Sequence, residues 1–295
     1  MSHVEPLAPQ GETLALQAID PLDFGYLEAL PRQRAGQGRL HLGHALGYTA
    51  GGGPDRPALL FVHGAHHGAW CFSAYLAFFD ALGIPAAALD LRGHGGLPQD
   101  AAFCRQGVAA MAEDVAAACA LLGPRVVPVG HSAGALVAAF AAMRQPIAGL
   151  GLLAPSPPGN LPQAARVEAV FDGSPLPVPP LAAAQARYLD EAAPRDVRRF
   201  YARLCPESPA LMNDRYGLRV PIDPRRIAVP GFCLAAGRDS PRTHPPGQDR
   251  AVAAFFGFRF AELPEAPHCC MLARDWSASA RYIAAWYSSV FHGTA

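Results

Sequence analysis

The stretch that decides the fold is VVPVGHSAGALVAAFAAM, residues 126–143. It opens with a short apolar run, typical of a strand buried on both faces, and closes with an Ala-, Leu- and Val-rich run that predicts a helix. Between them lies Gly130-His131-Ser132-Ala133-Gly134, a GxSxG pattern. Glycines on both sides allow a sharp strand-to-helix turn that exposes a serine under backbone strain. We therefore expect a strand, a tight turn presenting Ser132, and a helix.

Similar units lie on both sides of this stretch. Short, mostly unalternating apolar runs predict strands, and longer Ala-rich segments between them predict covering helices. This alternation indicates an α/β fold built on a doubly wound, mostly parallel sheet. The predicted strands are 58–62, 86–89, 126–129, 150–153, 231–235 and 258–263, and the predicted helices are 69–81, 108–122, 133–143, 248–256 and 273–290.

The chain divides into a core with one insertion and an N-terminal arm. Residues 1–37 are rich in Pro, Gln and Gly and show no clear periodicity, so we expect an arm there. The core is expected over 38–154 and 225–295. Residues 155–224 contain Pro-dense pieces around charged helical stretches. Their Leu, Tyr and Phe content favours a helical lid (cap) insertion over a disordered linker.

Composition excludes several classes of function. With 295 residues and 51% hydrophobic residues, the chain can bury one substantial core. Basic and acidic residues both number 24, so no net charge attracts nucleic acid or an anionic membrane. All the basic residues are arginine. Without lysine the chain cannot form a Schiff base with pyridoxal phosphate or complete a phosphate-binding GxxxxGK[ST] loop.

The cysteines and the N-terminus bear on location and partners. The seven cysteines are scattered without the paired spacing of a zinc site, so we expect reduced thiols. The start of the chain has no basic stretch followed by an apolar run, and no stretch of 18 uninterrupted apolar residues occurs. We expect a cytoplasmic protein with no membrane span, no cofactor and a small-molecule partner.

Two backbone amides are candidates for an oxyanion hole. A serine nucleophile needs donors for the oxygen that becomes negative in the tetrahedral intermediate. Ala133 follows Ser132 at a helix N-terminus, where its amide is free to donate. The predicted strand 58–62 is followed by His63-Gly64-Ala65-His66-His67-Gly68-Ala69-Trp70, and a loop in that place supplies the second donor in enzymes with this turn. Ala65 is the expected second donor.

The acid and the base are expected late in the chain, because enzymes with this turn carry nucleophile, acid and histidine in that order. Asp239 lies just past the predicted strand 231–235, and His268 lies in the loop after the predicted strand 258–263. We predict that His268 is the general base and that Asp239 orients it. His244 is a rival base but lies close to Asp239 in sequence. Should Asp239 fail as the acid, Asp214 and Asp223 are the alternatives.

Several further histidines and a cysteine are expected near the site. We assign His66, His67, His131 and Cys269 to the substrate pocket. His63, His66 and His67 could suggest a metal, but no carboxylate or cysteine accompanies them at helical spacing. We therefore predict no metal site there and a structural role for His63.

The strings HGAHHGAW, DLRGHG and GHSAGA resemble the α/β-hydrolase superfamily over residues 40–154 and 225–290. They are most similar to its carboxylesterase and methylesterase-like branch, which includes plant methylesterases and hydroxynitrile lyases. The resemblance implies the fold and a Ser-His-Asp serine hydrolase that cleaves a carboxylic ester through an acyl-enzyme. The branch's hydroxynitrile lyases use a lysine that this chain lacks. In DLRGHG, we expect Asp90 and Arg92 to make local hydrogen bonds that shape a turn.

Alternatives to ester hydrolysis remain open in the sequence. A thioesterase or an acyltransferase acting on a carrier-bound intermediate would use the same residues, and a non-catalytic ligand-binding homologue could retain them. Five arginines of the insertion could bind a carboxylate or a phosphopantetheine arm, although such a pattern is more typical of a solvated helix face. They are Arg187, Arg195, Arg198, Arg199 and Arg203.

Overall fold

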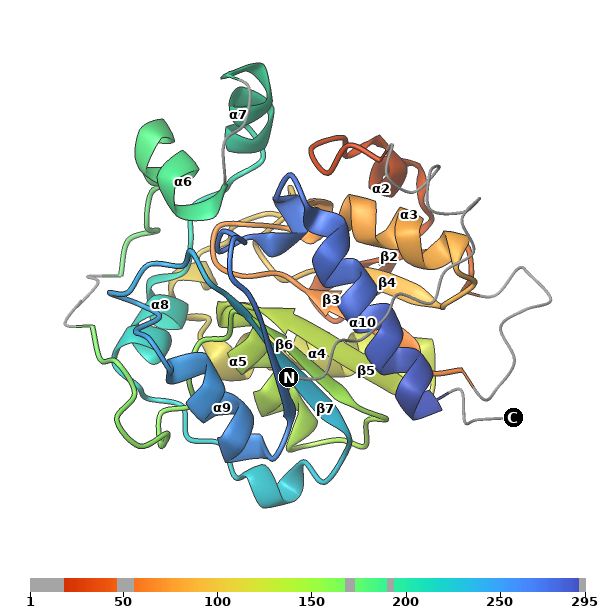
Figure 1. Ribbon diagram of the computed structural model, residues 1–295. Helices are drawn as coiled ribbons and strands as arrows, with labels where there is room; N and C mark the ends of the chain where they lie inside the picture. Colours follow the sequence, from red (N-terminus) through yellow and green to blue (C-terminus); the bar gives the residue numbers. More distant parts are fainter. Residues whose placement is uncertain (1–18, 47–55, 168–172, 190–193, 292–295) are drawn as a thin grey trace.

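The computed structural model describes residues 19–46, 56–167, 173–189 and 194–291. The first 18 residues of the expected arm, and parts of the expected insertion, lie outside these described residues. Figure 1 shows a twisted sheet through the middle of the molecule, with helices on both of its faces.

The sheet has eight strands in the order β1-β2-β4-β3-β5-β6-β7-β8. Strands β3 to β8 are parallel, whereas β2 is antiparallel to β1 and to β4. The mostly parallel sheet is thus confirmed. The strands are β1 (Arg32–Ala35), β2 (Gly38–Leu42), β3 (Ala58–Val62), β4 (Ala86–Asp90), β5 (Val126–His131), β6 (Leu150–Leu153), β7 (Gly231–Ala236) and β8 (Arg259–Leu263).

The hairpin of β1 and β2 was not predicted. β1 is the polar sequence RQRA, three of whose four side chains are exposed at the edge of the sheet. An exposed edge strand needs no apolar run, so the hydrophobic pattern gave no signal. Because β1 lies within residues 1–37, the sheet begins inside the segment expected to be an arm.

Helices lie at all the predicted positions of the core. The predicted helix 69–81 is a 3-10 turn followed by an α-helix, and the last predicted helix, 273–290, starts three residues later than predicted, at Trp276. The core helices are α2 (Gly25–Ala29), η1 (Ala69–Phe72), α3 (Ser73–Ala81), η2 (Phe103–Arg105), α4 (Val108–Leu122), α5 (Ala133–Ala142), α9 (Gln248–Phe256), η4 (Cys270–Leu272) and α10 (Trp276–Phe291).

The sheet separates two hydrophobic cores, which confirms the doubly wound arrangement. One core lies under α3 and α10 and is rich in aromatic rings, such as Phe61 stacked on Phe72 with centroids 5.1 Å apart. The other lies under α4, α5 and α9 and consists mostly of Val, Leu and Ala side chains. Within the described ranges, no helix is both long and apolar enough to cross a membrane.

Residues between β6 and β7 form the remaining helices, α6 (Leu181–Tyr188), α7 (Pro194–Tyr201), α8 (Pro209–Tyr216) and η3 (Pro224–Arg226). In Figure 1, α6 and α7 stand beyond one end of the strands, and α8 lies beside the sheet. α8 packs on α4 and α5.

The strand register brings several loops to one edge of the sheet. Val62 of β3 pairs with Gly130 of β5, and Leu153 of β6 pairs with both His131 and Leu234. The loops that follow these strands therefore leave the sheet side by side at its carboxyl edge. In open α/β sheets this edge is where ligands bind.

Candidate active site

Ser132 occupies the turn between β5 and α5 in a strained backbone conformation. Its φ is +54° and its ψ is −122°, a combination that costs about 1–3 kcal/mol for a residue with a side chain. A Cβ on Gly134 would lie 2.2 Å from the carbonyl oxygen of His63, and a Cβ on Gly130 would lie 2.4 Å from the oxygen of Gly134. Only glycine fits these approaches, so the two glycines let the turn close and hold Ser132 as predicted from the GxSxG pattern.

The loops after β7 and β8 bring Asp239 and His268 together. His268 Nδ1 donates a short hydrogen bond to Asp239 Oδ2, although the two residues are 29 positions apart. Both side chains are nearly fully buried. With its proton on Nδ1, neutral His268 presents Nε2 as an acceptor. This is the arrangement in which a carboxylate fixes the tautomer of a general base.

The pKa shifts of this pair favour a neutral histidine beside an ionised acid. Burial raises the pKa of Asp239, but the charge and hydrogen bond of His268 outweigh it and lower the pKa to about 2. Burial lowers the pKa of His268, and Asp239 offsets this only in part. Asp239 therefore remains a carboxylate, and His268 remains unprotonated, near neutral pH.

His131 ties the loop of His268 to the serine turn. Its Nε2 donates to the backbone oxygen of His268 at 2.9 Å. Burial lowers the pKa of His131 well below its usual range, so the ring is neutral. This bond links the residue before Ser132 to the residue that is its candidate base.

His67 and Cys269 form a second link between loops. Cys269 Sγ lies 3.4 Å from His67 Nε2, and His67 Nδ1 donates to the carbonyl oxygen of Ala65 at 2.7 Å. Burial lowers the pKa of His67 to about 3. Three of the residues expected to line the pocket, His67, His131 and Cys269, are thus buried and act as bridges between loops.

Ala65 and Ala133 lie on neighbouring loops at the carboxyl edge. Ala133 is the first residue of α5, so its amide has no acceptor within the helix. Ala65 is partly exposed and packs against Val167, Met212 and Tyr216. We call these three residues the Met212 cluster. The candidate oxyanion donor Ala65 is therefore covered by side chains of the insertion.

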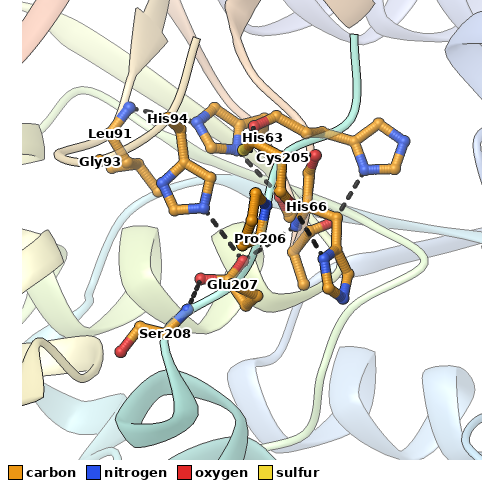
Figure 2. Close-up of polar contacts among 12 residues, drawn as sticks. His63, His66, Leu91, Gly93, His94, Cys205, Pro206, Glu207 and Ser208 are labelled. Atoms are coloured by element: carbon orange, nitrogen blue, oxygen red, sulfur yellow. Dashed lines mark hydrogen bonds and ion pairs between the residues drawn. The ribbon is translucent and has the colours of Figure 1, made fainter. Parts of the chain in front are cut away.

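A carboxylate from the insertion holds the loop of Ala65 in place. Figure 2 shows Glu207 among the histidines that follow β3 and β4. Glu207 Oε2 accepts from the backbone amide of His66 at 2.9 Å and from His94 Nε2 at 3.1 Å. His66, the residue after Ala65, has a positive φ of 66°, which a side chain tolerates only with such support.

His94 pairs with Glu207 as a cation. Its Nδ1 faces the carbonyl oxygen of Arg92 at 2.9 Å while its Nε2 faces the Glu207 carboxylate, so both nitrogens must donate. Burial lowers the pKa of His94, but the charge of Glu207 outweighs it and raises the pKa overall. Burial likewise raises the pKa of Glu207, but His94 outweighs it and lowers the pKa to about 2. A buried ion pair thus joins the insertion to the core.

Backbone contacts extend this attachment. The amide of Cys205 donates to the carbonyl oxygen of His66 at 3.0 Å, and His66 Nδ1 donates to the carbonyl oxygen of Cys205 at 3.0 Å (Figure 2). A further contact involves the loop that carries His268, where the amide of Cys269 donates to the carbonyl oxygen of Tyr188 at 3.3 Å. The insertion therefore touches the loops of both the candidate oxyanion hole and the candidate base.

His244 lies beside the candidate base and approaches the same carboxylate oxygen of Asp239. Its Nε2 lies 3.7 Å from Asp239 Oδ2, and its Nδ1 lies 3.2 Å from Asp249 Oδ1. Donor atoms of Asp239, His244 and His268 all lie within 4.8 Å of one another, close enough to hold a metal ion. An ion bound there would displace the hydrogen bond between His268 and Asp239. The existing bond therefore fits an acid and base pair better than a metal centre.

The other candidate acids have structural roles. Asp214 accepts from the amide of Val108 at the start of α4, and Asp223 pairs with exposed Arg225. Neither contacts His268, whereas Asp239 does.

The residues of DLRGHG shape the core, over longer range than expected. Asp90 accepts from the amide of Ala69 at 2.7 Å and from His41 Nε2 at 2.8 Å. Arg92 pairs with buried Asp114 of α4 at 2.8 Å. His63, assigned a structural role, accepts from the amide of the residue after Asp90 at 3.1 Å.

Glu207, Tyr188 and Arg215 were missed by the sequence analysis. All three lie in the insertion and reach the site only through tertiary contacts. No spacing or motif marks them, and a glutamate that pairs with a distant histidine resembles any surface glutamate in the sequence.

Comparison with known proteins agrees with the fold. The model of the alpha/beta hydrolase family matches residues 59–281. Esterase PIR7B from Oryza sativa subsp. japonica is 39% identical over 89 residues, which are 30% of this chain and 33% of that protein. The matched segment thus spans about a third of the length of the curated relative.

Solved structures show the same architecture. The methylesterase MES16 from Arabidopsis has a TM-score of 0.63 at 22% identity, covering 78% of this chain and 98% of the other. The enol-lactonase from Burkholderia xenovorans LB400 has a TM-score of 0.63 at 18% identity, covering 88% and 100%. With the family match over most of its length, this chain belongs to the alpha/beta hydrolase family.

Replacing the buried carboxylate tests the attachment of the insertion. We expect Glu207→Gln to lower the free energy of unfolding by about 3 kcal/mol, because His94 then lacks its charged partner. Because its pKa is raised in the folded protein, His94 contributes its full stabilisation below pH 6.5, the usual pKa of histidine. This contribution decreases as the pH rises through the raised pKa. Because its pKa is lowered in the folded protein, Glu207 contributes its full stabilisation above pH 4.5, the usual pKa of glutamate. This contribution decreases as the pH falls toward the lowered pKa of about 2.

The loss should therefore be largest between pH 4.5 and 6.5 and shrink at higher pH. Urea unfolding of both proteins across pH measures it. Glu113→Gln is the matched control, since that carboxylate is 70% exposed. Equal losses for the two variants, or a loss at Glu207 that does not change with pH, would contradict the ion pair.

Proposed function

We propose that this protein is a serine hydrolase that cleaves a carboxylic ester through a Ser132-His268-Asp239 triad. The observation that carries the proposal is the strained Ser132 turn at the same sheet edge as the hydrogen-bonded His268 and Asp239. Support also comes from relatives named as esterases, including the rice esterase and a thermophilic esterase from Thermogutta terrifontis with a TM-score of 0.63. His268 is neutral at the pH where such a base must accept a proton.

In the first half of the proposed reaction, Ser132 Oγ attacks the ester carbonyl while His268 Nε2 takes its proton. Asp239 stabilises the imidazolium that forms and stays ionised. The amides of Ala65 and Ala133 donate to the oxyanion, each contributing about 3 kcal/mol of transition-state stabilisation. His268 then returns the proton to the leaving alcohol, and an ester of Ser132 remains.

In the second half, His268 takes a proton from water as that water attacks the acyl-enzyme. The tetrahedral intermediate again places its oxygen between the two amides. Its collapse breaks the bond to Ser132 Oγ, which regains the proton from His268, and releases the carboxylic acid. Apart from the ester and this water, the proposed steps use groups of the chain itself.

We assign the role of a lid to the insertion, residues 155–224. Ser132 is 9% exposed and His268 is 2% exposed, so substrate must pass a covering element to reach them. Tyr188 of α6 supplies part of that cover, with its ring 6.1 Å from the ring of His268. We infer that α6 and α7 move to admit substrate while the contacts of Glu207 keep its part of the insertion attached to the core.

Turnover of simple esters tests the function. We expect wild-type protein to release p-nitrophenol from p-nitrophenyl esters, and Ser132→Ala to lose at least about 1,000-fold in kcat. Asp239→Asn should lose activity by orders of magnitude with an unchanged fold, because His268 then adopts the wrong tautomer. Ser277→Ala, at a partly exposed position in the first turn of α10, serves as the control.

An acyl-thioester assayed beside these esters separates ester from thioester cleavage. A faster rate on the thioester would favour the thioesterase alternative. Inactivity on every substrate in a protein that unfolds cooperatively would favour a ligand-binding homologue.

The pH dependence of turnover reports on His268. Burial lowers its pKa below the usual 6.5, so the base stays unprotonated to lower pH than a free histidine. We expect the acid limb of kcat/KM to have its midpoint below pH 6.5. A midpoint at or above that value would mean that another group limits the rate.

A further inference from the structure

Arg187 differs from Arg198, Arg199 and Arg203, which lie near it in the sequence of the insertion. Arg198, Arg199 and Arg203 are exposed, and Arg199 and Arg203 pair with acidic residues. Arg187 is partly buried, and among the described residues no carboxylate contacts it. Its Nη2 donates a long hydrogen bond of 3.4 Å to the hydroxyl of Tyr216. The side chain of Arg195 lies outside the described residues.

The contacts of Arg187 place it at the candidate active site. Tyr216 belongs to the Met212 cluster that covers Ala65, the candidate oxyanion donor. The guanidinium also lies over the ring of Tyr188, 5.3 Å from its centre, and that ring lies 4.9 Å from the ring of His67. Burial has the largest effect on the pKa of His268, followed by Asp239 and His244. The positive charge of Arg187 also lowers this pKa. Arg187 therefore lies between the oxyanion loop and the loop of the base.

A second arginine adds positive charge at the same place. Arg215 is 4% exposed and donates from Nε to Ser156 Oγ at 3.0 Å and from Nη2 to the carbonyl oxygen of Thr243 at 2.9 Å. Its Nη1 is buried, and the residues that the structure describes offer it no hydrogen-bond partner. Ser156 in turn donates its amide to the carbonyl oxygen of Ser132. Ser156 therefore connects the second guanidinium to the backbone of Ser132.

The carboxylates near the two arginines already have histidine partners. The charge of Asp239 acts on both arginines, and that of Asp249 acts on Arg215. Asp239 is hydrogen-bonded to His268, Asp249 lies against His244 and Glu207 is paired with His94, so these acids are engaged elsewhere than at Arg187. Buried charges in proteins are normally paired, and an arginine fork matches a carboxylate in particular.

We propose that the substrate carries an anionic group, a carboxylate, that binds Arg187 while its ester lies at Ser132. This inference rests on the proposed esterase function and names the class of ester: one whose acyl or alcohol part ends in a carboxylate a few bonds from the scissile carbonyl. Tyr216, already bonded to Arg187, holds the guanidinium in position. Arg215 adds positive potential without direct contact.

Paired substrates test the carboxylate. We expect wild-type protein to prefer monophenyl adipate over its neutral amide counterpart, the phenyl ester of adipamic acid. Arg187→Gln should reduce the acid-to-amide ratio of kcat/KM by about 10- to 100-fold, the value of a hydrogen bond to a charged group. The neutral ester is the reference substrate, so any general effect of the substitution on the site changes both rates and cancels in the ratio.

Two further variants serve as comparisons for the acid-to-amide ratio of Arg187→Gln. Arg187→Lys keeps the charge but loses the fork, so we expect an intermediate ratio. Arg199→Gln removes an arginine of the same insertion whose side chain is 48% exposed, and it should leave the ratio unchanged. No preference in wild type, or an unchanged ratio in Arg187→Gln, would overturn the proposal.

Calorimetric binding of N-phenyladipamic acid, which has an amide in place of the ester, makes the test independent of turnover. Wild type should bind it about 10- to 100-fold more tightly than Arg187→Gln. If neither ester is cleaved, the proposed ester hydrolysis is wrong. The binding comparison then still shows whether Arg187 binds a carboxylate. Equal binding by both proteins would contradict the carboxylate.

Discussion

The structure depends on one close approach, where the start of α5 meets the end of β3. Gly134 lies so near the carbonyl oxygen of His63 that a Cβ would come within 2.2 Å of it. This contact fixes the angle at which the chain leaves β5, and it holds Ser132 at a φ of +54°. It also brings the loop that carries Ala65 beside the serine. The nucleophile and the candidate oxyanion hole therefore follow from the same packing.

Polar links then assemble the rest of the site around that turn. His131 connects the serine turn to the loop of His268, and His67 connects the loop of Ala65 to Cys269. Glu207 adds the insertion, through His94 and the amide of His66. Because these histidines and the carboxylate are buried, each bond is made where water cannot replace it. Five parts of the chain are thereby held within reach of one another.

The parts of this arrangement that the sequence predicts are those with local signals. The run from 126 to 143 predicted β5, the turn and α5, and short apolar runs predicted the other parallel strands, because buried strands need continuous apolar residues. Asp239 and His268 were placed by chain order, and the structure brings their side chains into contact. The exposed edge strand β1 has no such pattern, and its polar residues were interpreted as an arm.

What the sequence could not predict depends on contacts between distant segments. Glu207 lies 113 positions from His94, and nothing in either neighbourhood indicates the other. The sequence also does not indicate that Arg187 lies near the site. It gives no reason to distinguish Arg187 from the four other arginines grouped with it, and the structure shows that Arg187 is partly buried. His67, His131 and Cys269 were expected in the pocket, yet their bonds show them bridging loops.

Covalent labelling tests the central claim, that the strained turn and the buried acid and base together activate Ser132. Intact-mass analysis after treatment with a fluorophosphonate, followed by peptide mapping, identifies the modified atom. The account predicts a single adduct on Ser132 in wild type, and none in Ser132→Ala. Wild-type protein that is folded but gains no adduct, or that carries it on another residue, would contradict the account.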